Sequence, residues 1–305
     1  MSTLPLLRFF NRLADNPIVI KELRGKMRSR RAFADLTIYL TLVSTVIVIV
    51  YLLFQEQANN GQMDPAFRQN VGKTIFGVVI VLELLMIGFI GPALTTGAIT
   101  GERERQTYDL LRTTLISPRM LVLGKLVSAC AYLLLLVFAA TPIEALAFLL
   151  GGVGLEEICV STLILLVNIV FFCALGLLCS SFARRTLTST ITSYSIILLS
   201  LLATGLILYI CVWILQTLPS SSPEYVALNI FSLYFCSINS LLTSLGSESF
   251  LTSSHVLFYG PTPFNYPNGQ SIFVFSPWVV HVPLVAILST IMILSSILFV
   301  NRAER

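Results

Sequence analysis

Charged residues are scarce in this chain of 305 residues. Asp, Glu, Lys and Arg together make up 11% of it, hydrophobic residues make up 56%, and the mean hydropathy is +0.88. Soluble domains contain about 25% charged residues, so this composition argues against a soluble globular fold. The chain is predicted to lie in a lipid bilayer.

The residue patterns of disulfide and metal sites are also missing. The six cysteines include no C-x-x-C pair, and most fall within or beside apolar stretches. That distribution argues against a disulfide framework or a metal cage. The two histidines, His255 and His281, lie far apart in the sequence and are expected near the outer side, in contact with solvent. No metal site is predicted.

Nucleotide-binding and hydrolase signatures are not found either. Gly72-Lys73-Thr74 resembles the end of a phosphate loop, but Phe67 stands where such a loop needs its first glycine. The H-E-x-x-H and G-x-S-x-G patterns are absent. The chain itself is therefore predicted not to be an enzyme and to bind no cofactor.

What the chain has instead is a set of six long apolar stretches. Each exceeds the roughly 20 residues that a helix needs to cross about 30 Å of hydrocarbon. Runs such as 133–138 lack the alternation of a barrel strand, and only helices and closed barrels satisfy their backbone groups in lipid. The fold is predicted to be all-α and polytopic, with a membrane domain at 33–300. Its six transmembrane helices are expected at about 33–54, 74–98, 120–150, 158–182, 188–218 and 277–300.

The positions of the basic residues predict the orientation. Of the 19 Lys and Arg residues, 17 fall before the first stretch or in the connections and tail on that same side, and only Arg68 and Lys73 fall on the other. Because basic residues gather on the cytoplasmic side, both termini and the tail at 301–305 are predicted to be cytoplasmic. The same distribution is typical of membrane anchoring, so no nucleic-acid partner is expected.

A polar break at 219–276 is predicted to form a large external loop between the fifth and sixth helices. Its apolar run at 226–235 is compatible with re-entrant or interfacial helices, and 259–269 is rich in turn residues. The loop is interpreted either as an outer lid over a transport path or as an ordinary extracellular cap.

Residues 1–32 are predicted to form a cytoplasmic amphipathic helix before the first span. Asn16 is a suitable N-cap and Pro17 fits the first turn. Apolar and basic residues then recur at helical spacing on different faces. Such a helix binds acidic lipid headgroups at the inner membrane surface, and a protein contact is compatible with the same pattern.

A charged insert at 100–118 separates the second and third apolar stretches. Placing its six charged residues in hydrocarbon would cost on the order of 15 kcal/mol, so the insert must lie in water or against protein. Thr100 is a suitable N-cap, Glu102 and Glu104 fit the first turn of a helix, and Ser117-Pro118 ends it. We expect a short, rigid helix. It either caps the bundle or transmits a movement of a cytoplasmic partner to the neighbouring transmembrane helices.

Several of these motifs together resemble the permease subunits of ABC exporters of the ABC-2 type, most closely over residues 16–126. The resemblance rests on Asn16-Pro17, Lys21-Glu22-Leu23-Arg24, Gly91-Pro92, Gly97, Gly101-Glu102-Arg103-Glu104-Arg105-Gln106-Thr107, Leu110-Leu111, Ser117-Pro118 and Gly124-Lys125.

The resemblance implies that the insert is a coupling helix on a separate cytoplasmic ATPase, with the segment before the first span as a connecting helix at the same interface. The implied contact residues are Glu102, Arg103, Glu104, Arg105, Thr107, Lys21, Glu22 and Arg24. It also implies ATP and Mg on the partner subunit, a second permease subunit, identical or different, and a place in the plasma membrane, such as a bacterial inner membrane.

Two carboxylates are expected at membrane depth, where ionisable groups usually face a bundle interior or cavity. Glu83 is interpreted either as part of the translocation path or as a hydrogen-bonded structural residue, whereas Glu144 is expected near the outer headgroups. Gly91, Pro92 and Gly97 predict either a hinge or close helix packing above the insert.

The function predicted from these features is a permease subunit of an ATP-driven exporter. One alternative is a membrane scaffold that recruits a cytoplasmic partner through the insert without transport. Another is an ATP-independent secondary transporter, although such proteins usually carry inverted repeats or more ionisable groups at midplane.

Overall fold

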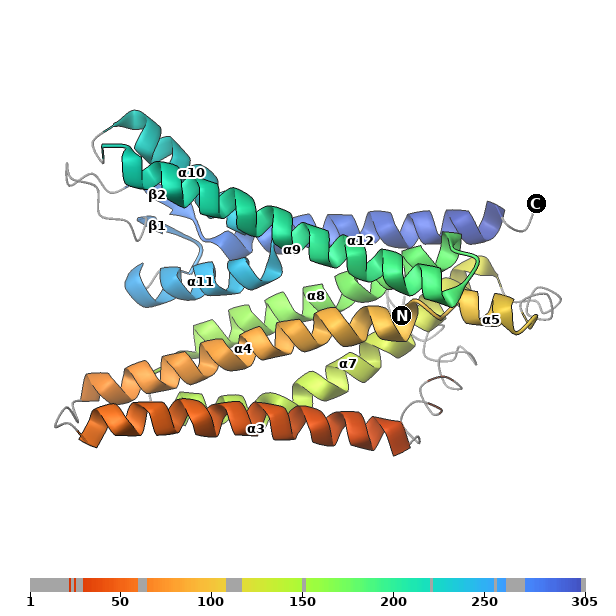
Figure 1. Ribbon diagram of the computed structural model, residues 1–305, viewed down its shortest axis with the longest axis horizontal. Coiled ribbons are helices and arrows are strands. Elements are labelled where there is room, and N and C mark those ends of the chain that lie inside the picture. Colours follow the sequence, from red (N-terminus) through yellow and green to blue (C-terminus); the bar gives the residue numbers. More distant parts are fainter. Residues whose placement is uncertain are drawn as a thin grey trace, which may run out of the picture.

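The computed structural model describes residues 22, 25, 30–59, 65–107, 117–149, 152–219, 222–254, 257–261 and 272–302 (Figure 1). Its long helices are α3 (Arg30–Asn59), α4 (Pro65–Thr95), α7 (Pro118–Leu149), α8 (Leu155–Phe182), α9 (Thr186–Thr217) and α12 (Pro277–Arg302). Shorter elements are α5 (Thr100–Glu104), α10 (Pro223–Cys236), α11 (Ser240–Ser254), β1 (Tyr259–Pro261) and β2 (Phe273–Phe275).

Six helices of the described chain are long and apolar enough to cross a membrane, so the predicted all-α, six-span architecture is confirmed. They cover Phe33–Phe54, Gln69–Glu104, Pro118–Leu149, Leu155–Phe182, Thr186–Thr217 and Pro277–Arg302. Each contains one of the predicted stretches or ends within a few residues of it. Long apolar runs are a strong signal because lipid leaves the backbone few alternatives to a helix.

Helix α8 lies at the centre of the bundle. It packs against α4, α7, α9 and α12, and α3 closes the far side against α4 and α7 (Figure 1). Its small residues allow this close approach: Gly176 faces Pro92 of α4, and Gly91 of α4 faces Phe172. By contrast, α9 exposes most of its leucines and isoleucines, as expected for a helix whose surroundings are lipid or another protein.

The two ends of the bundle differ. One end carries α5 and the C-terminal end of α12, and we call it the α5 end (Figure 1). The other carries α10, α11 and the antiparallel pair of β1 and β2, in which Gly260 lies opposite Val274. Helices α10 and α11 are bent by 118° at a short break, the geometry of a broken span or a re-entrant loop. Part of the predicted external loop is therefore helical.

The insert after α4 does not form the single helix predicted for 100–118. Helix α5 ends at Glu104, and Gln106 adopts a left-handed backbone with φ of 57°. The backbone N–H groups of Gln106 and Thr107 turn back to the carbonyls of Arg103 and Glu102, which closes the helix in a Schellman-type end. Glycine usually marks such an end, so this one could not be predicted from Gln106. Residues 108–116 lie outside the described part of the chain.

Candidate functional site

Helix α5 is attached to the C-terminal end of α8 by buried hydrogen bonds. The backbone N–H groups of Ile99 and Thr100 both donate to Oγ of Ser180, at 2.9 and 3.1 Å. The hydroxyl of Thr100 donates to the carbonyl of Thr96 at 2.8 Å, so Thr100 is not the predicted N-cap. Ile99 takes that position. The first turn of α5 is therefore fixed by a side chain of α8.

Two charged residues of α5 reach the connection between α8 and α9. The guanidinium of Arg103 donates to the carbonyls of Ala183 at 2.9 Å and Ser181 at 3.1 Å, at the C-terminal end of α8. The carboxylate of Glu104 accepts from the backbone N–H and the hydroxyl of Thr186, at 2.7 and 2.9 Å, in the first turn of α9. Each charge has the sign that the adjacent helix dipole favours.

A third charged group connects α5 to α7 and to the N-terminal segment. The ammonium of Lys125, on α7 and 6% exposed, lies 3.0 Å from Oε1 of Glu22 and 3.5 Å from Oε1 of Glu102. Ser128, one turn further along α7, donates to Glu22 at 2.7 Å. We call Glu22, Glu102 and Lys125 the Lys125 cluster. It joins three segments that lie far apart in the sequence.

The predicted contact residues thus fall into three groups. Glu102, Arg103 and Glu104 bind other parts of the same chain, and the hydroxyl of Thr107 donates to the carboxylate of Glu102. Arg105 is exposed, and its guanidinium has no partner among the described residues. Glu22 lies in the Lys125 cluster. Lys21 and Arg24 lie outside the described residues.

The two intramembrane carboxylates come together inside the bundle. Glu83 is 1% exposed, and Oε1 accepts a hydrogen bond from the hydroxyl of Tyr39 at 3.1 Å. Glu144 is close enough to interact with it electrostatically, whereas Oε2 of Glu83 has no hydrogen-bond partner among the described residues. Glu144 is 7% exposed and therefore faces the bundle interior. The expectation that it lies near the outer headgroups stays a prediction.

The predicted hinge residues lie where α4 passes α8. Pro92 is inside α4, and a Cβ added at Gly91 would come within 3.2 Å of Phe172. A Cβ at Gly97 would make an ordinary 3.5 Å contact with Thr186. Gly91 therefore serves close packing. The helix ends at Thr95, and a turn over 96–99 leads into α5.

The sequence analysis did not predict a group of buried hydrogen bonds around His281, at the end of the bundle opposite α5. His281 is fully buried, not solvated as expected, and its Nδ1 lies 2.7 Å from the carbonyl of Ser237 in the break between α10 and α11. Its Nε2 lies 3.1 Å from the amide nitrogen of Asn168 on α8. A single histidine near a predicted helix start gave no signal for this role. These hydrogen bonds connect the break between α10 and α11 to α8 and α12.

Comparison with known families agrees with this architecture. A family model described as "ABC-2 family transporter protein" matches residues 16–302, nearly the whole chain. The chain belongs to the ABC-2 transporter family. This ABC-2 protein is a multi-pass membrane protein and a permease component of an ABC transporter. The permease component is not itself an ATPase, in line with the missing phosphate loop. No curated protein matches the chain significantly.

Proposed function

We propose that this ABC-2 permease docks through its α5 end on a separate cytoplasmic ATPase subunit and exports a substrate when that subunit binds and hydrolyses ATP. The observation that supports this most is the attachment of α5. Three of its charged side chains are bound to α7, α8 and α9, while Arg105 and Gln106 at its tip are exposed. A partner that displaces this tip must displace the helices bonded to it.

The proposed step is a conformational one, and ATP with its Mg belongs to the partner. Movement of α5 pulls on Lys125 of α7 and on the α8–α9 connection, and thereby changes the access of a path from one side of the membrane to the other. A second permease subunit, identical or different, completes the path. The distribution of the basic residues supports an orientation with both termini in the cytoplasm. The family resemblance supports a place in the plasma membrane.

Glu83 is proposed to act beside this path. Buried carboxyls in membrane bundles usually line cavities or make internal hydrogen bonds, and here the second use is visible in the bond from Tyr39. We therefore assign Glu83 to the α3–α4–α7 contact that has to rearrange during transport. The substrate itself is not assigned.

Purification from the native membrane tests the docking. In mild detergent, the tagged chain is expected to bring down a nucleotide-binding subunit in stoichiometric amount. Arg105→Glu is expected to reduce that yield by about tenfold or more, because a charge at the tip is reversed without breaking a bond seen within the chain. The readout is the ratio of the two subunits after size-exclusion chromatography.

Arg302→Glu is the matched control, since Arg302 is also exposed and lies at the same end of the bundle, on α12. It is expected to leave the ratio unchanged. A solitary permease in both detergent and crosslinked membranes, or equal losses for the two reversals, would contradict docking at α5.

A further inference from the structure

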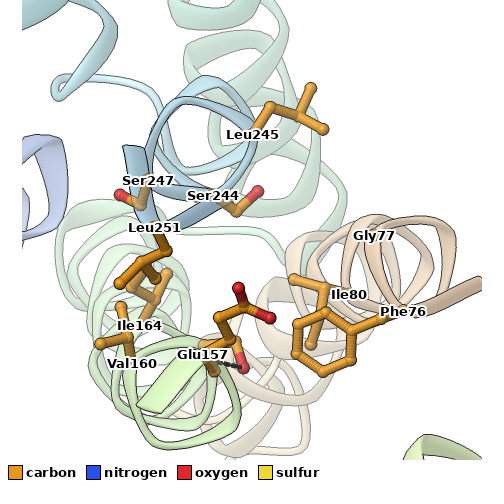
Figure 2. A pocket seen from close by; sticks show the side chains of 11 residues that line it. Phe76, Gly77, Ile80, Glu157, Val160, Ile164, Ser244, Leu245, Ser247 and Leu251 are labelled. Carbon is orange, nitrogen blue, oxygen red and sulfur yellow. Dashed lines mark hydrogen bonds between the residues drawn. The ribbon is translucent and has the colours of Figure 1, made fainter. Parts of the chain in front are cut away.

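Helix α11 meets α4 and α8 across a narrow groove with mainly apolar walls, lined by side chains such as Phe76 and Leu251 (Figure 2). Two serines of α11 also line it. Ser244 donates to a carbonyl of α11 itself, and the hydroxyl of Ser247 has no hydrogen-bond partner among the described residues. Neither hydroxyl therefore attaches α11 to α4 or α8 in the described chain. The polar attachment lies at the break before α11, around His281.

The hydrogen bonds of His281 indicate which ring nitrogen carries the proton. Nδ1 lies 2.7 Å from the carbonyl oxygen of Ser237, which can only accept, so Nδ1 is the donor. The amide nitrogen of Asn168 donates to the carbonyl of Ile164 at 2.8 Å and lies 3.1 Å from Nε2, so Nε2 accepts its second hydrogen. Oδ1 of Asn168 accepts from the hydroxyl of Ser240, which supports this orientation of the amide. The arrangement requires a neutral imidazole.

The surroundings of the imidazole carry no charge that would stabilise a protonated ring. Its polar contacts among the described residues are Asn168, Ser237 and the hydroxyl of Thr243, which lies 3.2 Å from Nδ1. Titratable residues at this end of the helices packed around it are Glu144 of α7, Glu156, Glu157 and Cys159 of α8, Glu224, Tyr225, Tyr234 and Cys236 of α10, and Glu248 of α11. The side chain of Glu248 lies outside the described part. None of the others has a polar contact with the imidazole.

A second proton on His281 is incompatible with these bonds. Nε2 would become a donor facing the amide nitrogen of Asn168, which is also a donor. Rotating that amide would place Oδ1 against the carbonyl oxygen of Ile164. The ring is fully buried, and a buried cation without an anionic partner is strongly disfavoured. The protonated ring is therefore stable only in a state in which water reaches it.

We propose that His281 is a pH-sensitive switch: the neutral ring holds the break between α10 and α11 against α8, and the protonated ring releases it. The 118° bend at this break places both short helices on one attachment. The hydroxyl of Ser237 is buried there without a partner among the described residues, so it gains a bond to water on release. In the orientation supported by the basic residues this end faces outside, so an acidic exterior favours release. The switch does not depend on docking of an ATPase.

Hydrogen–deuterium exchange of the full chain in phosphatidylcholine nanodiscs, without ATPase or nucleotide, tests the switch. Mass spectrometry at about pH 7.5 and about pH 5.5 gives protection factors, each relative to an unstructured peptide at the same pH. For a peptide spanning 236–245, protection is expected to fall about tenfold or more at the acidic pH. One linked proton can shift an opening equilibrium by up to about 100-fold over this interval. A peptide from the middle of α8, 170–178, is expected to keep its protection.

His281→Gln removes the titrating group and keeps one donor and one acceptor at the same place. It is expected to give peptide 236–245 the same protection at both pH values. His255→Gln is the matched control, because His255 is the other histidine of the chain. It is expected to lose protection on acidification as the wild type does. Asn168→Asp supplies an anionic acceptor for the protonated ring, so its acid-induced loss is expected to shrink to less than about threefold.

Two results would overturn the proposal. The first is unchanged protection of the wild-type chain on acidification. The second is an equal acid-induced loss in His281→Gln and wild type, which would place the titration on another group, such as Glu157 or Glu248. If His281→Gln does not fold, Asn168→Asp decides, and an acid-induced loss as large as that of the wild type would contradict the switch.

Discussion

Replacing Lys125 with methionine is expected to lower the thermal stability of the permease markedly. Methionine keeps the apolar stem but removes the ammonium, so the carboxylates of Glu22 and Glu102 lose their shared cation. Breaking a buried pair costs about 3–5 kcal/mol, and the partial exposure of both carboxylates reduces this to about 2 kcal/mol here. The midpoint of heat-induced aggregation in detergent, followed by size-exclusion chromatography, is expected to fall by about 5 °C.

Removal of all three charges separates the loss of the pair from the loss of packing. In the triple variant Glu22→Gln, Glu102→Gln, Lys125→Met, the Lys125 cluster carries no charge. Its midpoint is expected to recover most of the way to wild type, since a neutral cluster of similar shape avoids the penalty of unpaired carboxylates. A triple variant no more stable than Lys125→Met would show that the three residues do not act together.

Gly176→Ala is expected to disturb the bundle still more. A Cβ at this position would lie 2.2 Å from Oγ1 of Thr95, 2.9 Å from Cα of Pro92 and 3.2 Å from its carbonyl oxygen. The Pro92 atoms are backbone, so α4 and α8 must move apart. Forced overpacking typically costs about 1–3 kcal/mol, and a contact against two backbone atoms belongs at the upper end. Heat-induced aggregation measures the loss.

Gly205→Ala is the natural control for that change. Gly205 is also inside a long helix, α9, but nothing lies within 4 Å of the Cβ that alanine would add. Alanine is the better helix former by about 1 kcal/mol, so this variant is expected to be as stable as wild type or more so. Equal behaviour of the two alanine variants would refute close packing of α4 on α8 at Pro92.

The sequence predicted the membrane architecture well because hydropathy and chain length decide it. Six apolar stretches of sufficient length specify six helices, whatever their neighbours are. It could not show how those helices pair. The bonds from Arg103 to Ser181 and from Glu104 to Thr186 connect residues about 80 positions apart, and no local pattern encodes such a distance. The charges therefore looked available for an external partner.

Local rules also failed at one specific point. Gln106 ends α5 in a left-handed conformation, for which glycine is the usual sequence signal. The pairing of Glu144 with Glu83 was likewise not predictable, because it depends on how α4 and α7 pack. The sequence predicted that a helix begins near Thr100. Its bonds to α7, α8 and α9 could be seen only in the tertiary structure.

Site-specific crosslinking in intact native membranes tests the central claim most directly, because no detergent can then strip a partner from the permease. A photoreactive amino acid at position 105, at the exposed tip of α5, is expected to form an adduct with a nucleotide-binding subunit. The same amino acid at Leu245, exposed on α11 at the opposite end, is expected to form none. An ATPase adduct at 105 alone would support coupling through α5; its absence at 105, or equal adducts from both positions, would contradict the account.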